Sequence, residues 1–234
     1  MTREEIMLSY IKRDGLGLEI GAGCAPIAPK KQGFRVHVLD HCDKALVEIY
    51  RPHGINVDNI EEVDFIWDGW SYTELVGRRH VYDWIIGSHV DHFRPLTGIG
   101  RVIDAGRNPQ RIHSAGTAME YFLTVVSRGH RIAWDANEEG EFKLVHSLEE
   151  AKQAVRDGSE RGNYLDLHEW CFTPTSFRLM MRDLFELGLI QLKELVFHPS
   201  QGSEFFIALF RSGALPPGTR LELLEQILRE QSVV

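Results

Sequence analysis

The first ninety residues alternate between short apolar runs and helical stretches, and this alternation leaves few folds open to the chain. The helical stretches include a short helix in a loop at 25–34, a helix at 42–54 and a short helix at 71–77. Strands separated by helices make right-handed crossovers, which build a mostly parallel sheet. The pattern therefore predicts four parallel strands in the order 3-2-1-4. The four apolar runs are residues 15–21, 35–40, 60–67 and 82–89.

After residue 90 the pattern changes to helices and hairpins. We expect two short strands within 130–146 and a C-terminal antiparallel hairpin from 189–199 and 204–211. The fold class is then α/β, with a Rossmann-like mostly parallel sheet and a helical insertion over 91–170. We expect one domain over residues 1–211 and a helical tail over 212–234. The helices of this part are expected at 113–129, 147–158, 173–188 and 216–231. Ser147, three residues before Glu150, and Thr173, followed by Pro174, are the expected N-caps of the second and third of these helices.

The tail helix carries a stripe of leucines, Leu221, Leu224 and Leu228. Residues three and four apart lie on one face of a helix, so the stripe forms a continuous apolar surface. We expect this surface to dock onto the body of the protein, with a homodimer contact as the alternative.

Charge and composition exclude several functional classes. The net charge is −8 and no Lys/Arg cluster stands out, which argues against a nucleic-acid partner. No apolar run approaches the ~20 residues that a membrane span needs. The three cysteines have no C-x-x-C spacing. The first residues do not resemble a secretory signal; they predict a helix that begins with a capping box between Thr2 and Glu5. These features favour a cytoplasmic protein without membrane association.

The first apolar run ends in an acid-x-Gly-x-Gly turn made by Glu19, Gly21 and Gly23. A dinucleotide fingerprint would have a third glycine where Pro26 stands, and Glu19 would repel a pyrophosphate. S-adenosylmethionine suits the turn better, because it carries an ammonium and a sulfonium and no phosphate. Asp40 closes the second run and can accept the ribose hydroxyls. Asp68 closes the third run and can reach the adenine amino group.

Four segments, LEIGAGCAPI, VHVLDH, VDFIWDG and DWIIGSHV, resemble the successive cofactor-binding segments of class I S-adenosylmethionine-dependent methyltransferases. DHFRPLTGIGRVIDA, RIAWD, LVHSLEEA and HEWCFTPTSFRLMMRDL are similar to later segments of a bacterial subgroup of that family, so the resemblance reaches about Arg211. It implies that residues 1–211 form a methyltransferase-like domain. It also implies methyl transfer from S-adenosylmethionine to a small-molecule or saccharide acceptor.

The resemblance also assigns the cofactor site residue by residue. Glu19, Gly21, Ala22 and Gly23 would hold the methionine portion, Asp40 and His41 the ribose, Asp68 and Gly69 the adenine, and Ser88 and His89 would line the pocket after the fourth strand.

The sequence departs from the family pattern at GSHVDHFRPLTG, residues 87–98. The family continues from the fourth strand into a helix, a Lys-Pro-Gly-Gly-type turn and a fifth strand, and this chain has no such turn. A fifth strand is therefore missing. The sheet can close with the C-terminal hairpin beside the fourth strand, or a strand from 130–146 or from a second chain can fill the gap. Alternatively, the shortened chain binds its ligand without performing chemistry.

Histidines supply the candidate catalytic groups. His89, His92 and His168 are candidate bases for deprotonating an acceptor hydroxyl, as is Glu169; the alternative for each is an ordinary loop hydrogen bond. The HVDH stretch at 89–92 matches only part of a metallo-β-lactamase-type signature, whose first His would fall at Gly87. We therefore expect no metal. Besides the methyltransferase, two functions stay open: a non-catalytic S-adenosylmethionine-binding or interaction protein of this fold, and a metallohydrolase.

Overall fold

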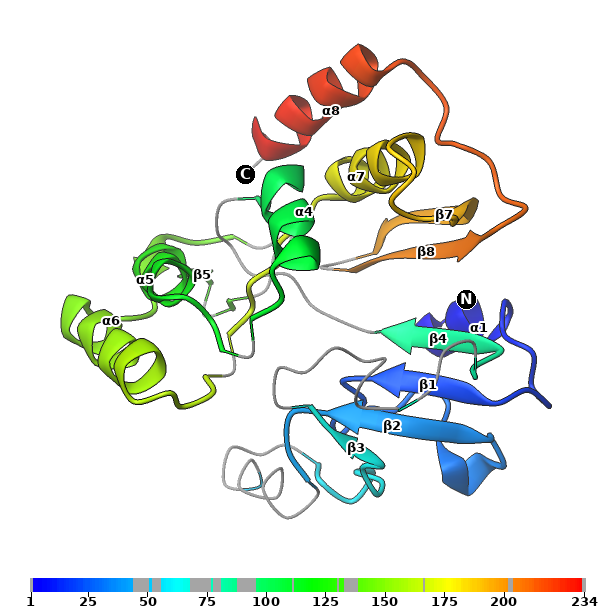
Figure 1. Ribbon diagram of the computed structural model, residues 1–234, viewed down its shortest axis with the longest axis horizontal. Coiled ribbons are helices and arrows are strands. Elements are labelled where there is room, and N and C mark those ends of the chain that lie inside the picture. The colour runs from blue at the N-terminus through cyan, green and yellow to red at the C-terminus, as the bar shows by residue number, and fades with distance from the viewer. Residues whose placement is uncertain are drawn as a thin grey trace. The chain divides into compact units, whose positions relative to one another are not determined.

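The computed structural model divides into two compact units, Met1–His89 with Pro109–Ile112 and Val90–Asn108 with His113–Val234 (Figure 1). The predicted boundary at residue 211 stays a prediction. The residues that the structure describes are 2–43, 51, 56–67, 77, 81–87, 96–110, 112–129, 131–132, 139–165, 167–201 and 204–232.

The first unit contains the predicted parallel sheet. Its strands lie in the order β3-β2-β1-β4, and every pairing is parallel. In register, Ile20 of β1 stands between Leu39 of β2 and Gly87 of β4, so the carboxyl ends of these strands meet at one edge. The α/β class and the 3-2-1-4 order are confirmed. The strands are β1 (Gly17–Ile20), β2 (Val36–Asp40), β3 (Phe65–Ile66) and β4 (Trp84–Gly87).

Strand β3 is shorter than the predicted run at 60–67. The carboxylate of Asp64 accepts a hydrogen bond from the Val38 N–H at 2.7 Å and pairs with Lys30 Nζ at 2.7 Å. The Val38 N–H of β2 is therefore bound by the Asp64 side chain and is not available to the backbone of a longer β3. Most of the predicted helices at 42–54 and 71–77 falls outside the described residues.

One face of the sheet packs against the chain's N-terminal helix and the loop that follows β1. Helix α1 (Arg3–Leu8) begins with the expected capping box between Thr2 and Glu5. The short helix expected in the loop is the 3₁₀ turn η1 (Lys30–Gln32). The core of this face consists of Ile27, Ala28, Phe34, Val36, Trp84 and Ile86, with Met7, Leu8 and Ile11 packed against it.

The second unit holds the helical insertion and the C-terminal hairpin. Ser147 and Thr173 cap α6 and α7 as predicted. β7 and β8 pair antiparallel as a two-stranded sheet, so the hairpin is confirmed, and what lies beside β4 stays a prediction. The elements are α4 (Ile99–Arg107), α5 (Ala115–Thr124), β5 (Val126–Arg128), β6 (Phe142–Leu144), α6 (Leu148–Val155), the π-helical turn η3 (Arg156–Glu160), α7 (Pro174–Glu186), β7 (Lys193–Gln201), β8 (Glu204–Phe210) and α8 (Arg220–Ser232).

The helix predicted over 113–129 ends early. α5 stops at Thr124, Val125 is already extended with ψ 124°, and Val126–Arg128 pair with β6. Two consecutive valines favour extended backbone because branching at Cβ crowds the preceding helical turn. Of the two strands expected within 130–146, the second is present as β6, whereas its partner β5 lies before that range.

Helix α8 lies beside α7 (Figure 1). Leu221, Leu224 and Leu228 are 65%, 45% and 66% exposed, whereas Leu223 is 4% exposed. Polar contacts anchor the helix: Arg220 donates to Asp183 at 2.8 Å, and the Thr175 N–H donates to Glu230 at 3.2 Å. The prediction that the leucine stripe docks onto the body is therefore wrong, and the dimer contact stays a prediction. Among the described residues, no helix has the length and apolar character needed to cross a bilayer.

Candidate functional site

The turn after β1 requires its two glycines. Gly21 and Gly23 have φ values of 67° and 49°, in the left-handed region that side chains with a Cβ disfavour. The Gly21 N–H still continues the ladder to the Leu39 carbonyl at 2.9 Å. A Cβ added to Gly23 would meet no atom of the described residues within 4 Å, so within this part of the chain the backbone of the turn borders open space.

Asp40, the last residue of β2, is hydrogen-bonded to this turn. Its Oδ2 accepts from the Gly23 N–H at 3.2 Å. Its Oδ1 accepts from the His41 N–H at 2.8 Å and lies 2.8 Å from His41 Nδ1. Burial raises the pKa of Asp40, but the bonds from His41 and Gly23 outweigh burial and hold the pKa below its usual value. The carboxylate is therefore ionised and available as an acceptor at neutral pH.

Glu19 has a different environment from the one expected for a ligand contact. Its side chain is 1% exposed, and its two oxygens accept from the N–H groups of Ile27 at 2.6 Å and Ala28 at 3.0 Å. Burial raises the pKa of Glu19, and the two N–H donors only partly offset this effect. Because both oxygens bind loop amides, Glu19 holds the loop from residue 20 to residue 28 in shape. This geometry favours a positioning role over direct contact with a ligand's ammonium.

The structure thus brings part of the predicted site together. Gly21, Ala22, Gly23, Asp40 and His41 gather where β1 and β2 end. In a sheet of order 3-2-1-4 the order of the strands switches between β1 and β4, and ligands of open α/β sheets bind at the carboxyl ends of the strands beside such a switch point. The other predicted positions, Asp68, Gly69, Ser88, His89 and His92, lie outside the described residues.

A second polar cluster lies in the second unit and includes His113, a residue that the sequence analysis did not single out. Glu169 Oε2 lies 3.3 Å from His113 Nδ1, and its Oε1 lies 3.5 Å from Arg101 Nη2. Arg101 also pairs with Glu120. His113 Nε2 is buried and has no hydrogen-bond partner within the described part of the chain. A carboxylate that orients one ring nitrogen and leaves the other uncommitted is an arrangement suited to proton transfer.

Of the two sequence candidates in this region, Glu169 belongs to the cluster, and His168 is half-buried next to it in the chain. His113 was missed because it stands alone in the sequence, just before the helix-capping Ser114. Only the fold brings it to Glu169.

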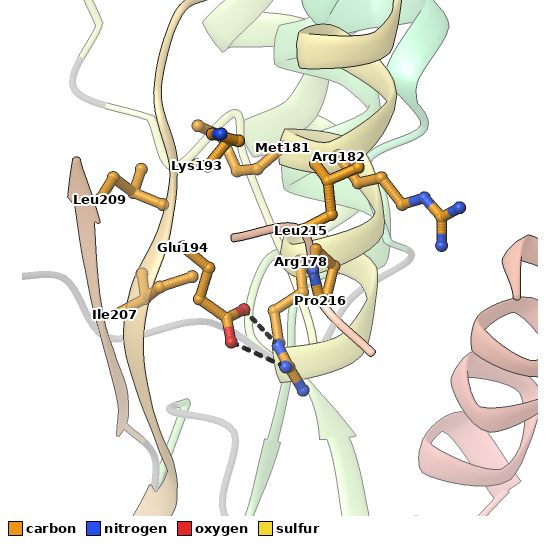
Figure 2. Close-up of a pocket in the computed structure, with 9 residues that line it drawn as sticks. All are labelled: Arg178, Met181, Arg182, Lys193, Glu194, Ile207, Leu209, Leu215 and Pro216. Carbon is orange, nitrogen blue, oxygen red and sulfur yellow. Dashed lines mark hydrogen bonds and ion pairs between the residues drawn. The ribbon is translucent and has the colours of Figure 1, made fainter. Parts of the chain in front are cut away.

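A pocket lies between α7 and the β7–β8 hairpin, and two of the side chains that line it bind each other (Figure 2). Arg178 makes two hydrogen bonds to Glu194, at 2.7 and 2.8 Å, and its guanidinium lies 4.2 Å from the centre of the Phe197 ring. These contacts tie the helix to the hairpin. The space of about 210 Å³ beside these side chains includes open solvent.

Comparisons of the chain with protein-family models, with curated proteins and with solved structures found no match. The functional argument therefore rests on the chain's own residues.

Proposed function

We propose that the chain is an S-adenosylmethionine-dependent methyltransferase that binds its cofactor at the carboxyl edge of β1 and β2. The observation that carries the proposal is the hydrogen bond between Asp40 and the Gly23 N–H, in a parallel sheet of order 3-2-1-4. It sets an ionised acceptor beside a glycine turn that a ligand can approach closely. No phosphate is required, in agreement with the acidic character of the site.

The cofactor supplies an activated methyl group, so the protein's tasks are alignment and proton removal. Asp40 orients the ribose, and Glu19 holds the loop whose backbone faces the methionine portion. The acceptor is a small molecule or a saccharide. For a hydroxyl acceptor, the base candidates are the ones that the sequence suggests, His89, His92, His168 and Glu169.

A second candidate function is a non-catalytic S-adenosylmethionine-binding or interaction protein. The departure at residues 87–98 favours it, because the segment that follows β4 in the family is the one that frames the acceptor. The metallohydrolase hypothesis rests on residues 89–92, which lie outside the described residues.

Calorimetric titration of the full chain with S-adenosylmethionine and S-adenosylhomocysteine tests the proposal. We expect binding of both, and at least a tenfold loss of affinity in Asp40→Ala, since two charge-assisted bonds contribute well over the ~1.4 kcal/mol that one decade requires. Asp58→Ala is the matched control, because that side chain is 85% exposed in the same unit. Failure of the wild type to bind either compound would refute the proposal.

Catalysis is tested separately, by following S-adenosylhomocysteine formation with a panel of phenols and saccharides. Turnover with any acceptor supports the enzyme. Tight binding without turnover across the panel favours the non-catalytic binding protein.

A further inference from the structure

The residues that follow β2 offer a donor set that nucleoside binding does not use in full. We propose that Asp40, His41 and Cys42 together bind a divalent transition-metal ion of the zinc class. One ligand atom from each residue, a carboxylate oxygen, an imidazole nitrogen and the thiol sulfur, lies within 4.8 Å of the other two. In tetrahedral zinc sites such atoms are roughly 3.3 to 3.6 Å apart, so small side-chain rotations close the set around an ion.

The backbone explains how three consecutive residues converge. Along a strand, successive side chains point to opposite faces of the sheet, so three consecutive strand residues cannot bind the same metal ion. β2 ends at Asp40, and residues 41 and 42 lie in a bend. The bend ends the alternation and turns the three donors toward one another.

The chemistry of the set selects the metal. Thiolate and imidazole favour zinc and cobalt over magnesium and calcium, which prefer oxygen ligands only. Asp40 and Cys42 are 7% and 6% exposed, so the ion would bind where little water screens its attraction to the anionic ligands. With three protein ligands, the fourth position is open to water.

Cys24 gives the site a close control. It packs against the cluster of Cys42, Val57 and Ile60, yet its sulfur does not belong to the three-residue set. Cys171 gives a remote control, since it is buried in the second unit. The proposed site requires the thiol of Cys42 and neither of the other two.

A consequence follows if the proposed function also holds. Asp40 cannot ligate a metal and accept ribose hydroxyls with the same oxygens, so the metal and the nucleoside exclude each other. Zinc would then act as an inhibitor of cofactor binding.

The experiment is a cobalt(II) titration of the full-length, chelator-treated protein, followed by displacement with zinc. We expect one equivalent of cobalt and a thiolate-to-cobalt charge-transfer band that zinc removes. Cys42→Ser should abolish the band, His41→Ala should weaken cobalt binding at least tenfold, and Cys24→Ser and Cys171→Ser should keep it. Melting curves of each variant establish that it is folded.

Absence of the band in the wild type, its persistence in Cys42→Ser, or its loss in Cys24→Ser would each overturn the metal site. A direct titration with S-adenosylhomocysteine in chelator separates this outcome from the proposed function. Cobalt binding without nucleoside binding leaves the metal site standing and removes the methyltransferase; the reverse result removes only the metal site.

Discussion

The Asp40 carboxylate accepts a hydrogen bond of 3.2 Å from the Gly23 N–H, and this bond links the end of β2 to the turn after β1. The bond forms because parallel neighbours end at the same edge and because Gly23, with φ 49°, turns its N–H toward that edge. The shape of the turn and the position of the acid therefore depend on each other.

Replacing Gly23 with alanine separates backbone strain from ligand contact. Among the residues that the structure describes, no atom lies within 4 Å of the added Cβ, so the expected cost to folding is that of the left-handed conformation, about 1–2 kcal/mol. The added methyl occupies space that we assign to the ligand, so S-adenosylhomocysteine affinity should fall at least tenfold.

Gly33→Ala is the matched control for this variant. Gly33 has φ 85° and equally open surroundings, but it ends η1 and lies outside the proposed site. Urea denaturation should show similar losses of stability for both variants, and calorimetry should show a loss of affinity for Gly23→Ala alone. Equal affinities in the two variants would contradict the placement of the ligand.

Glu19→Gln should destabilise the loop without distinguishing between ligands. Glutamine offers one acceptor and one donor to two N–H groups, so one bond is lost and two donors face each other, at a cost of about 1–3 kcal/mol. S-adenosylhomocysteine and methylthioadenosine, which lacks the amino-acid end, should lose affinity alike, as measured by calorimetry.

Glu61→Gln is the control for Glu19→Gln, because Glu61 also accepts two backbone N–H groups, those of Lys30 and Lys31 at η1. It should cost some stability and leave both affinities unchanged. A selective loss of S-adenosylhomocysteine in Glu19→Gln would instead restore the ammonium contact that the sequence suggested.

The sequence predicted those features that depend on local pattern. Strand order 3-2-1-4 followed from the alternation, and the caps at Thr2, Ser147 and Thr173 followed from single residues and their spacing. The glycine turn could be read because Gly21 and Gly23 stand directly after an apolar run.

Features that depend on tertiary contacts could not be predicted from the sequence. Glu19 precedes a glycine turn whether it points at a ligand or at the amides of Ile27 and Ala28, and only the fold decides between them. The pairing of His113 with Glu169 joins distant segments without a motif. The leucine stripe of α8 shows that an apolar periodicity identifies a helix face but not its partner.

Asp183 on α7 should make stability depend on pH. Its side chain is 6% exposed, Oδ2 accepts from Arg220, and Oδ1 is buried with no hydrogen-bond partner within the described part of the chain. Burial raises its pKa, although Arg220 acts in the opposite direction. A raised folded-state pKa means that stability is fully present below the unfolded value, 3.8, and is lost as the pH rises through the folded value.

Asp183→Asn should therefore be more stable than the wild type at pH 7 by roughly 1 kcal/mol, because the neutral amide avoids burying a charge. The two proteins should converge below about pH 4. Urea denaturation across this range measures the difference, with Asp104→Asn, an exposed acid on α4, as the control. A variant that is less stable than the wild type at pH 7 would show that the bond to Arg220 outweighs the cost of burial.

His41 should compete with the ribose for Asp40. An ionised carboxylate has about four acceptor sites, and the Gly23 N–H, the His41 N–H and His41 Nδ1 occupy three of them. Two ribose hydroxyls need two sites, so the imidazole must leave Oδ1 when the nucleoside binds. In chelator, His41→Ala should therefore bind S-adenosylhomocysteine as well as the wild type or up to about tenfold better. A hydrogen bond to an ionised carboxylate contributes about 1.5 kcal/mol or more, and ~1.4 kcal/mol corresponds to one decade of affinity.

The same variant should lose stability in a pH-dependent way, which serves as an internal control that the His41–Asp40 bond exists in solution. Burial raises the pKa of Asp40, and the bonds from His41 and Gly23 together lower it by more, so the folded-state pKa lies below the unfolded 3.8. The stability that this shift contributes is present above pH 3.8 and is lost as the pH falls through the folded value. His41→Ala should be less stable than the wild type at pH 7 and should converge with it in acid. A large loss of nucleoside affinity together with unchanged stability would mean that His41 contacts the ligand and does not compete with it.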